Sequence, residues 1–90
     1  MKRLRVSYTG TVQGVGFRYT AVRLAQDVGV TGRVGNLPDG RVDLLAEGEE
    51  ALLIALQSAI EKEMGHHITE RTTWWEAATG EFNDFTVAFF

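Results

Sequence analysis

The sequence lacks cysteine, contains a single proline and has no apolar run long enough to cross a membrane as a helix. Without cysteine, disulfide bonds and thiolate catalysis are excluded, so the fold depends on packing for its stability. The N-terminal residues lead directly into a strand pattern without the apolar segment of a signal peptide, and we expect a cytoplasmic protein. Nine Lys and Arg stand against twelve Asp and Glu, a net charge of −3. This balance argues against a nucleic-acid-binding surface dominated by phosphate contacts.

The length and composition fit one small globular domain. Ninety residues, 44% of them apolar and 23% charged, predict a single domain over 1–90. Segments with alternating or continuous apolar residues predict strands over 2–9, 30–36, 41–47, 68–79 and 85–89. Helical spacing of apolar residues predicts helices over 17–28 and from 48–50 to 64–65. The Leu-Pro-Asp-Gly turn at 37–40 makes a hairpin of the second and third strands.

The order of these elements predicts the fold class. A β-α-β-β-α-β order plus a final strand is typical of an α+β two-layer sandwich of ferredoxin-like type. In such a fold the sheet is antiparallel and both helices cover one of its faces. The third strand is expected to turn Val42, Leu44 and Ala46 toward the helices, and its alternate residues toward the open face.

Burial can be predicted in the same way for the other elements. The buried stripe of the second helix is expected to contain Leu52, Leu53, Leu56, Ala59 and Ile60. In the last strand, one side is expected to carry Phe85, Val87 and Phe89. Neighbouring tryptophans of a strand face opposite ways, and by phase Trp75 is expected in the core and Trp74 on the open face.

The stretch from Gly10 to Arg18 carries the main functional signal, with three glycines and one arginine directly before a predicted helix. Glycine takes backbone angles with φ > 0, and a sharp loop with inward N–H groups makes an anion-binding nest. The helix that follows adds unpaired N–H donors and the positive end of its dipole. Arg18 adds a permanent charge and a planar fork of donors. Together these features predict a site for a small phosphate group.

Simpler explanations exist for each part of this signal. Three glycines alone are typical of a tight strand-to-helix turn, and a single arginine is most often a solvated helix charge. The stretch is not a Walker loop, because no Gly-Lys-Ser/Thr follows, nor a dinucleotide fingerprint, because Tyr19 replaces the last glycine. Asn36 alone reads as a strand-end or turn residue. In a β-α-β unit, however, the second strand returns to the end where the loop lies, so Asn36 can approach Arg18.

Two motifs resemble the signatures of the acylphosphatase family. The first is Gly10-x-Val12-Gln13-Gly14-Val15-Gly16-Phe17-Arg18, and the second is Gly32-x-Val34-x-Asn36-x-x-Asp39-Gly40-x-Val42. The resemblance implies that Arg18 and Asn36 are the catalytic residues. It also implies a phosphate-binding loop made of Gln13, Gly14, Val15, Gly16, Phe17 and Arg18. Thr11 and Arg33 depart from the family pattern, at positions that are not catalytic; they put substrate preference and open-face packing in question.

The implied reaction is hydrolysis of the carboxyl–phosphate bond of small acyl phosphates, giving a carboxylate and inorganic phosphate. The leaving carboxylate is a stable anion, so no general acid is needed. Amides and Arg18 would neutralise the phosphoryl oxygens, and the Asn36 amide would orient the attacking water. The resemblance implies no cofactor and no metal, and we expect a monomer with no nucleic-acid or membrane partner.

Three other interpretations remain open at this point. The domain could bind phosphate or carbamoyl phosphate without catalysis, since similar domains occur at the head of larger carbamoyl-transfer maturation proteins. It could bind RNA, but RNA-recognition modules need central-strand aromatics on a basic surface, and the first strand offers only Tyr8. His66 and His67 suggest a metal, yet adjacent histidines after a helix end have no ligand spacing, and we expect none bound there.

Overall fold

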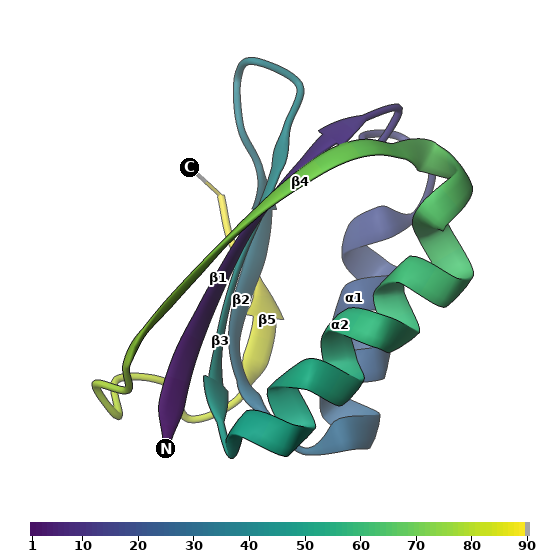
Figure 1. Ribbon diagram of the computed structural model, residues 1–90. Coiled ribbons are helices and arrows are strands. Elements are labelled where there is room, and N and C mark those ends of the chain that lie inside the picture. Colours follow the sequence, from purple (N-terminus) through teal and green to yellow (C-terminus); the bar gives the residue numbers. More distant parts are fainter. Residues whose placement is uncertain (90) are drawn as a thin grey trace.

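The computed structural model describes residues 1–89, which form one five-stranded sheet with both helices on the same face (Figure 1). The elements are β1 (Lys2–Gly10), α1 (Phe17–Val28), β2 (Thr31–Asn36), β3 (Val42–Gly48), α2 (Glu50–Met64), η1 (Gly65–His67), β4 (Ile68–Ala77) and β5 (Phe85–Val87). The strand order is β4-β1-β3-β2-β5. The predicted ferredoxin-like sandwich is therefore confirmed, and the helix predicted over 17–28 has the observed bounds.

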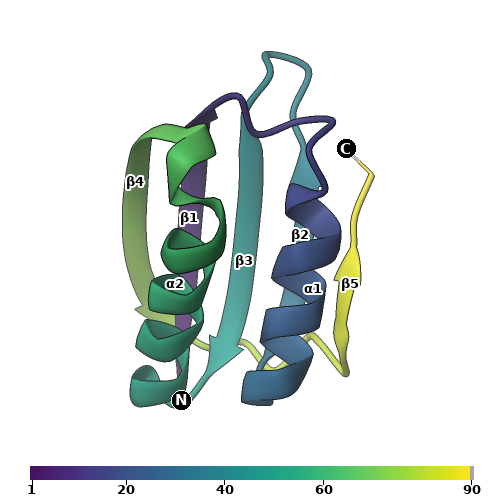
Figure 2. The same ribbon diagram turned by 90° about the vertical axis from the view of Figure 1, so that its right-hand side faces the viewer.

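The sheet is antiparallel across β1 to β4, as predicted, but the prediction was wrong for β5, which is parallel to β2. β1 lies between β3 and β4, and β2 pairs with β3 as a hairpin. β5 joins the free edge of β2, with Gly32 opposite Phe85. The parallel orientation follows from the connection: residues 78–84 cross the sheet at the end where β2 begins (Figure 2). The chain thus enters β5 in the same direction as β2.

The core lies between the sheet and the helices. Its buried residues include Leu4, Val6 and Tyr8 of β1, and Val42, Leu44 and Ala46 of β3, the face predicted for that strand. α2 contributes Leu53, Leu56, Ile60 and Met64. The prediction for Leu52 was wrong: its side chain is 37% exposed. Leu52 lies about 100° around the helix from Leu53, at the flank of the buried stripe formed by Leu53, Leu56, Ile60 and Met64.

Trp75 was also predicted in the core, and this was wrong although the face was right. Its backbone partner on β1 is Leu4, so it lies on the helix side of the sheet. It remains 42% exposed, because β4 is an edge strand. Trp74 lies on the open face as predicted, with the Arg5 guanidinium 5.2 Å from its ring centroid.

The last strand is shorter than predicted. β5 ends at Val87, although the Ala88 amide still donates to the Val34 carbonyl at 2.8 Å. Phe89 lies beyond the paired region and is 90% exposed, so it does not share the buried side of Phe85. Phe90, the last residue of the predicted domain, lies outside the described residues.

Glu47 faces away from the helices and is nevertheless buried, at 4% exposure. Residues 79–81 cover its carboxylate, which accepts hydrogen bonds from the Thr79 amide at 2.9 Å and the Gly80 amide at 2.9 Å. The Arg3 guanidinium pairs with it at 2.8 Å and also with Glu81. Burial by itself raises the pKa of Glu47, but the Thr79 amide, Arg3 and the Gly80 amide outweigh it and lower the pKa to about 2. This network attaches the β4–β5 connection to β1 and β3.

Candidate active site

The glycine-rich loop connects β1 to α1 at the end of the sheet where β2 and β3 form their hairpin (Figure 2). Two of its glycines take the left-handed conformation, Gly14 with φ 75° and Gly16 with φ 80°. Gly16 is the N-cap of α1 and supplies no side chain to cap the helix, and the first turn contains no acidic residue. The first amides of α1 therefore keep free donors and the positive end of the helix dipole.

Neighbouring elements hold this loop in place. The Thr11 amide donates to the His67 carbonyl at 2.9 Å, which attaches the start of the loop to η1. At the other end Phe17 is 2% exposed, and its ring lies 5.0 Å from that of Tyr8. Burial raises the pKa of the Tyr8 phenol, so this ring stays neutral. The loop is thus fixed at both ends before any ligand arrives.

The loop borders a cavity of about 230 Å³, lined by Val12, Gly14, Gly16, Phe17, Arg18 and Tyr19. The wall of the cavity therefore includes the backbone of two glycines, the first residues of α1 and one arginine. Four of the six residues of the predicted phosphate loop line this cavity, and Gln13 and Val15 do not. Amides with a cation in one concave loop are suited to the oxygens of a phosphate group.

Arg18 differs from most other arginines of the chain in its partners. Arg3, Arg5, Arg23, Arg41 and Arg71 each form an ion pair with a carboxylate. Within residues 1–89, Arg18 forms neither an ion pair nor a side-chain hydrogen bond, although it is half-buried. Its charge is consequently not neutralised by a carboxylate among the described residues and can act on an anionic ligand.

Asn36 ends β2 and faces the helix side, opposite Val42 of β3. The side chain of Gln13 connects the loop to this hairpin: its Nε2 donates to the Leu37 carbonyl at 2.9 Å and to the Arg41 carbonyl at 3.0 Å. Asn36 and the loop are thereby brought to one end of the molecule, as predicted. The Gln13 side-chain amide is thus bonded to the hairpin, so the phosphate contact predicted for Gln13 would have to come from its backbone N–H.

Asn36 carries a polar atom without a partner. Its Oδ1 is buried and accepts no hydrogen bond within the described part of the chain. A buried polar atom in this state costs about 1–3 kcal/mol. Within the same residues two other side-chain atoms, the Tyr8 hydroxyl oxygen and Asp43 Oδ1, are also buried without a partner, and neither belongs to the predicted site.

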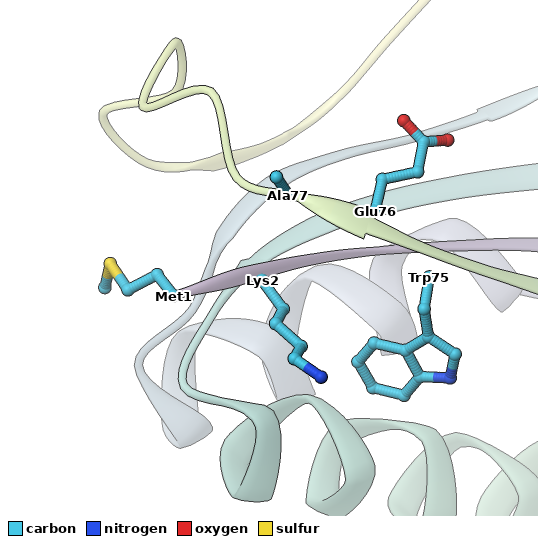
Figure 3. A pocket seen from close by; sticks show the side chains of 5 residues that line it. All are labelled: Met1, Lys2, Trp75, Glu76 and Ala77. Carbon is cyan, nitrogen blue, oxygen red and sulfur yellow. The ribbon is translucent and has the colours of Figure 1, made fainter.

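Two other features lie away from this site. Within residues 1–89 no group of three or more potential metal ligands is found, and His66 and His67 contact each other with ring centroids 4.0 Å apart. Another hollow, of about 390 Å³, lies at the opposite end of β1 beside Met1 and Lys2 (Figure 3). There Trp75 and Lys2 point toward the helices and Glu76 points the other way. Neither the histidine pair nor this hollow contributes a residue to the cavity beside the glycine-rich loop.

The sequence did not predict the two hydrogen bonds from the Gln13 side chain to the β2–β3 hairpin, here called the Gln13 bridge. Gln13 was assigned to the loop because of its position in the motif, but its side-chain acceptors lie 24 and 28 residues later. The Asp-Gly turn predicts a hairpin, and it says nothing about which carbonyls remain open to a distant donor. A single sequence holds no signal for that pairing.

Comparison with known proteins identifies the family. The Acylphosphatase family model matches residues 4–87. An acylphosphatase from Methylococcus capsulatus is 42% identical, over 97% of this chain and 96% of its own length. The crystal structure of acylphosphatase from Bacillus subtilis is similar with a TM-score of 0.90 and 30% identity, covering 99% of this chain and all of that one.

The chain belongs to the acylphosphatase family. Its reaction is the hydrolysis of acyl phosphates, with a carboxylate and inorganic phosphate as products. A third similarity is to T. kodakarensis HypF, with a TM-score of 0.83 and 27% identity, and there the chain covers 12% of a much longer protein. Neither helix within residues 1–89 is long and apolar enough to cross a membrane. This acylphosphatase fold thus places its glycine loop, Arg18 and the β2–β3 hairpin at one end of the sheet.

Proposed function

We propose that Arg18 and the amides of residues 13–18 hold the phosphoryl group of a small acyl phosphate, while Asn36 orients the attacking water. The support for Arg18 is its charge, which has no carboxylate partner within residues 1–89 and borders the loop cavity. The support for Asn36 is its place at the end of β2, beside the hairpin that Gln13 holds, and its Oδ1, which has no hydrogen-bond partner among residues 1–89. The Gln13 bridge keeps the two on neighbouring segments.

The chemistry asks for no general acid. The water oxygen attacks phosphorus, and the bond from phosphorus to the acyl oxygen breaks with its electron pair staying on the carboxylate. A proton of the water passes to an oxygen of the phosphoryl group itself, so phosphate leaves in protonated form. A carboxylate has a pKa near 4 and is a good leaving group at neutral pH. The protein's part is to position the reactants and to stabilise the charge on the phosphoryl oxygens.

The single observation that carries the residue assignment is the unneutralised guanidinium of Arg18 at the loop cavity. Hydrolysis of benzoyl phosphate by metal-free protein in EDTA tests it, together with competitive inhibition by inorganic phosphate. An amide NMR titration with phosphate locates the site, and we expect the largest shifts at residues 13–19. Shifts centred elsewhere, or turnover that disappears with EDTA, would contradict the proposal.

The same experiment separates catalysis from simple binding. A phosphate-binding or carbamoyl-phosphate-binding module would give the NMR shifts without turnover. We further propose that the protein acts as one domain over 1–90, as a monomer, in the cytoplasm, and without a metal, cofactor or nucleic-acid partner. Cell fractionation and a salt-dependent RNA gel shift test the location and the absence of nucleic-acid binding.

A further inference from the structure

Tyr19 stands out among the residues that line the loop cavity. Gly14 and Gly16 have no side chains, and Val12 and Phe17 are 1% and 2% exposed. The remaining lining residues are Arg18 and Tyr19, and Tyr19 is 75% exposed. Tyr19 therefore offers the main apolar side-chain surface at the rim of the proposed phosphate site.

The Tyr19 ring contributes little to the fold. Its side chain makes no hydrogen bond, ion pair or ring contact with any other of residues 1–89. Single exposed aromatic rings are common on protein surfaces, but this ring lies on the wall of the proposed phosphate site, where it is available for contact with a bound ligand. It lies one residue after Arg18 in the first turn of α1, so its backbone position is fixed by the helix.

The geometry of the reaction decides which part of the substrate meets this ring. Attack and departure at phosphorus are roughly in line, so the acyl group leaves on the side opposite the water. The proposed water lies at Asn36, which does not line the cavity. The acyl group is therefore directed away from the β2–β3 hairpin, toward the rim formed by the start of α1.

We propose that the Tyr19 ring is a platform for the acyl group and gives this enzyme a preference for acyl phosphates with a flat, apolar acyl group over acetyl phosphate. This inference rests on the proposed roles of Arg18 and Asn36. An aromatic acyl group packs against the ring by offset or edge contacts, and a contact of this kind changes binding by about 3–10-fold. A methyl group as small as that of acetyl phosphate covers too little of the ring to gain as much.

The test compares kcat/KM for benzoyl phosphate and acetyl phosphate in the wild type, Tyr19→Ala and Tyr19→Phe. Alanine is a good helix former and Tyr19 is exposed, so the variants are expected to fold. We expect the benzoyl-to-acetyl ratio of kcat/KM to fall about 3–10-fold in Tyr19→Ala and to be restored in Tyr19→Phe. Trp74→Ala is the matched control, because it removes an aromatic ring of 43% exposure from the open face of the sheet.

The outcomes separate this inference from the proposed function. An unchanged ratio in Tyr19→Ala, in an enzyme that hydrolyses both substrates, overturns the role of Tyr19 and leaves the reaction in place. An equal fall in the Trp74→Ala control also overturns it, since the effect would not be local. A wild-type protein that binds phosphate at the loop but hydrolyses neither substrate overturns the proposed function, and this inference with it.

Discussion

Arg18 carries its charge in a setting that few charged residues of the chain share. Arg23, five residues later in α1, is 55% exposed and its guanidinium pairs with Glu63 at 2.6 Å. Such an exposed pair contributes about 0–1 kcal/mol to stability. Arg18 is half-buried beside the loop and has no carboxylate partner within residues 1–89, so its charge remains available. The two arginines of α1 therefore form a matched pair for an experiment.

Arg18→Gln is expected to lower kcat/KM for benzoyl phosphate by about 10³–10⁵-fold, because an arginine at a transferring phosphoryl group has an effect of that size. It is also expected to abolish the NMR shifts caused by phosphate. Steady-state kinetics and the titration measure these losses, with Arg23→Gln as the control on the same helix. Comparable activity in the two variants would show that Arg18 is an ordinary surface charge.

Asn36→Ala is expected to separate activity from stability. If Asn36 orients the water, kcat falls by about 10²-fold or more while the inhibition constant of phosphate changes little. Because Oδ1 is buried without a partner, its removal leaves no other group unsatisfied, and Tm is expected to stay level or rise. Kinetics and thermal unfolding measure both, with Asn83→Ala in the exposed connection as the control. Full turnover in Asn36→Ala would rule out the water-orienting role.

Two contacts between elements decide how the site and the sheet hold together. The first is the bridge from the Gln13 side chain to the β2–β3 hairpin, and the second is the cluster of Arg3, Thr79 and Gly80 around Glu47. The bridge lies at the end of the sheet with the loop. The cluster lies at the other end, where residues 78–84 cross to β5.

Gln13→Met retains about the same volume and removes the donors to the Leu37 and Arg41 carbonyls. We expect a loss of about 1–2 kcal/mol in unfolding free energy. We also expect kcat to fall by about 10–100-fold, because a small displacement of Asn36 from the loop is enough to misplace the water. Urea unfolding and kinetics measure these effects. Gln26→Met on α1 is the control, because within residues 1–89 the Gln26 side chain bonds only to the Phe85 carbonyl, at 3.4 Å. Loss of stability without loss of kcat would mean that the bridge does not position the site.

The low pKa of Glu47 predicts how the stability of the fold changes at acidic pH. The folded pKa of about 2 lies below the ordinary value of 4.5, so the ionised carboxylate stabilises the fold by about 2–3 kcal/mol. This contribution is fully present above about pH 5 and is lost as the pH falls from there toward 2. Glu47→Gln should therefore be less stable than the wild type at pH 7 and approach it in acid.

Urea unfolding at pH 7, 5 and 3 measures the gap between the wild type and Glu47→Gln. Glu49→Gln is the control, since Glu49 is an exposed N-cap residue with no ion pair among the described residues. A gap of the same size at all three pH values would mean that the carboxylate charge is not responsible.

At the scale of the whole molecule, a single copy of the chain supplies all the residues of the hydrophobic core. Both helices and all five strands contribute to it or support it, and Tyr8, Phe17 and Phe85 are among its largest fully buried side chains. The polypeptide has a mass of 10.0 kDa and needs no second copy to cover this core. We therefore expect light scattering after size exclusion to give a monomer over the micromolar range. A stable dimer would contradict this and would direct attention to the exposed edge of β4.

The fold class and the site elements could be predicted because their signals are local. The helical spacing from Phe17 to Val28, the Asp-Gly turn and the glycine loop before Arg18 each depend on neighbours in the sequence. Burial was predicted less well. The alternation of residues in β4 correctly predicts that Trp75 faces the helices. It does not predict that β4 lies at the edge of the sheet, where Trp75 stays partly exposed.

The sequence by itself determined the element order, the position of the glycine loop ahead of a helix and the resemblance that names the reaction. Tertiary structure alone decided the parallel pairing of β5, the burial of Glu47 beneath residues 79–81 and the bridge from Gln13 to the Leu37 and Arg41 carbonyls. The physical reason is the sequence distance over which each kind of interaction acts. Periodicity and turn chemistry act over a few residues, whereas these contacts join groups 24 to 53 positions apart, whose meeting depends on how the whole sheet is assembled.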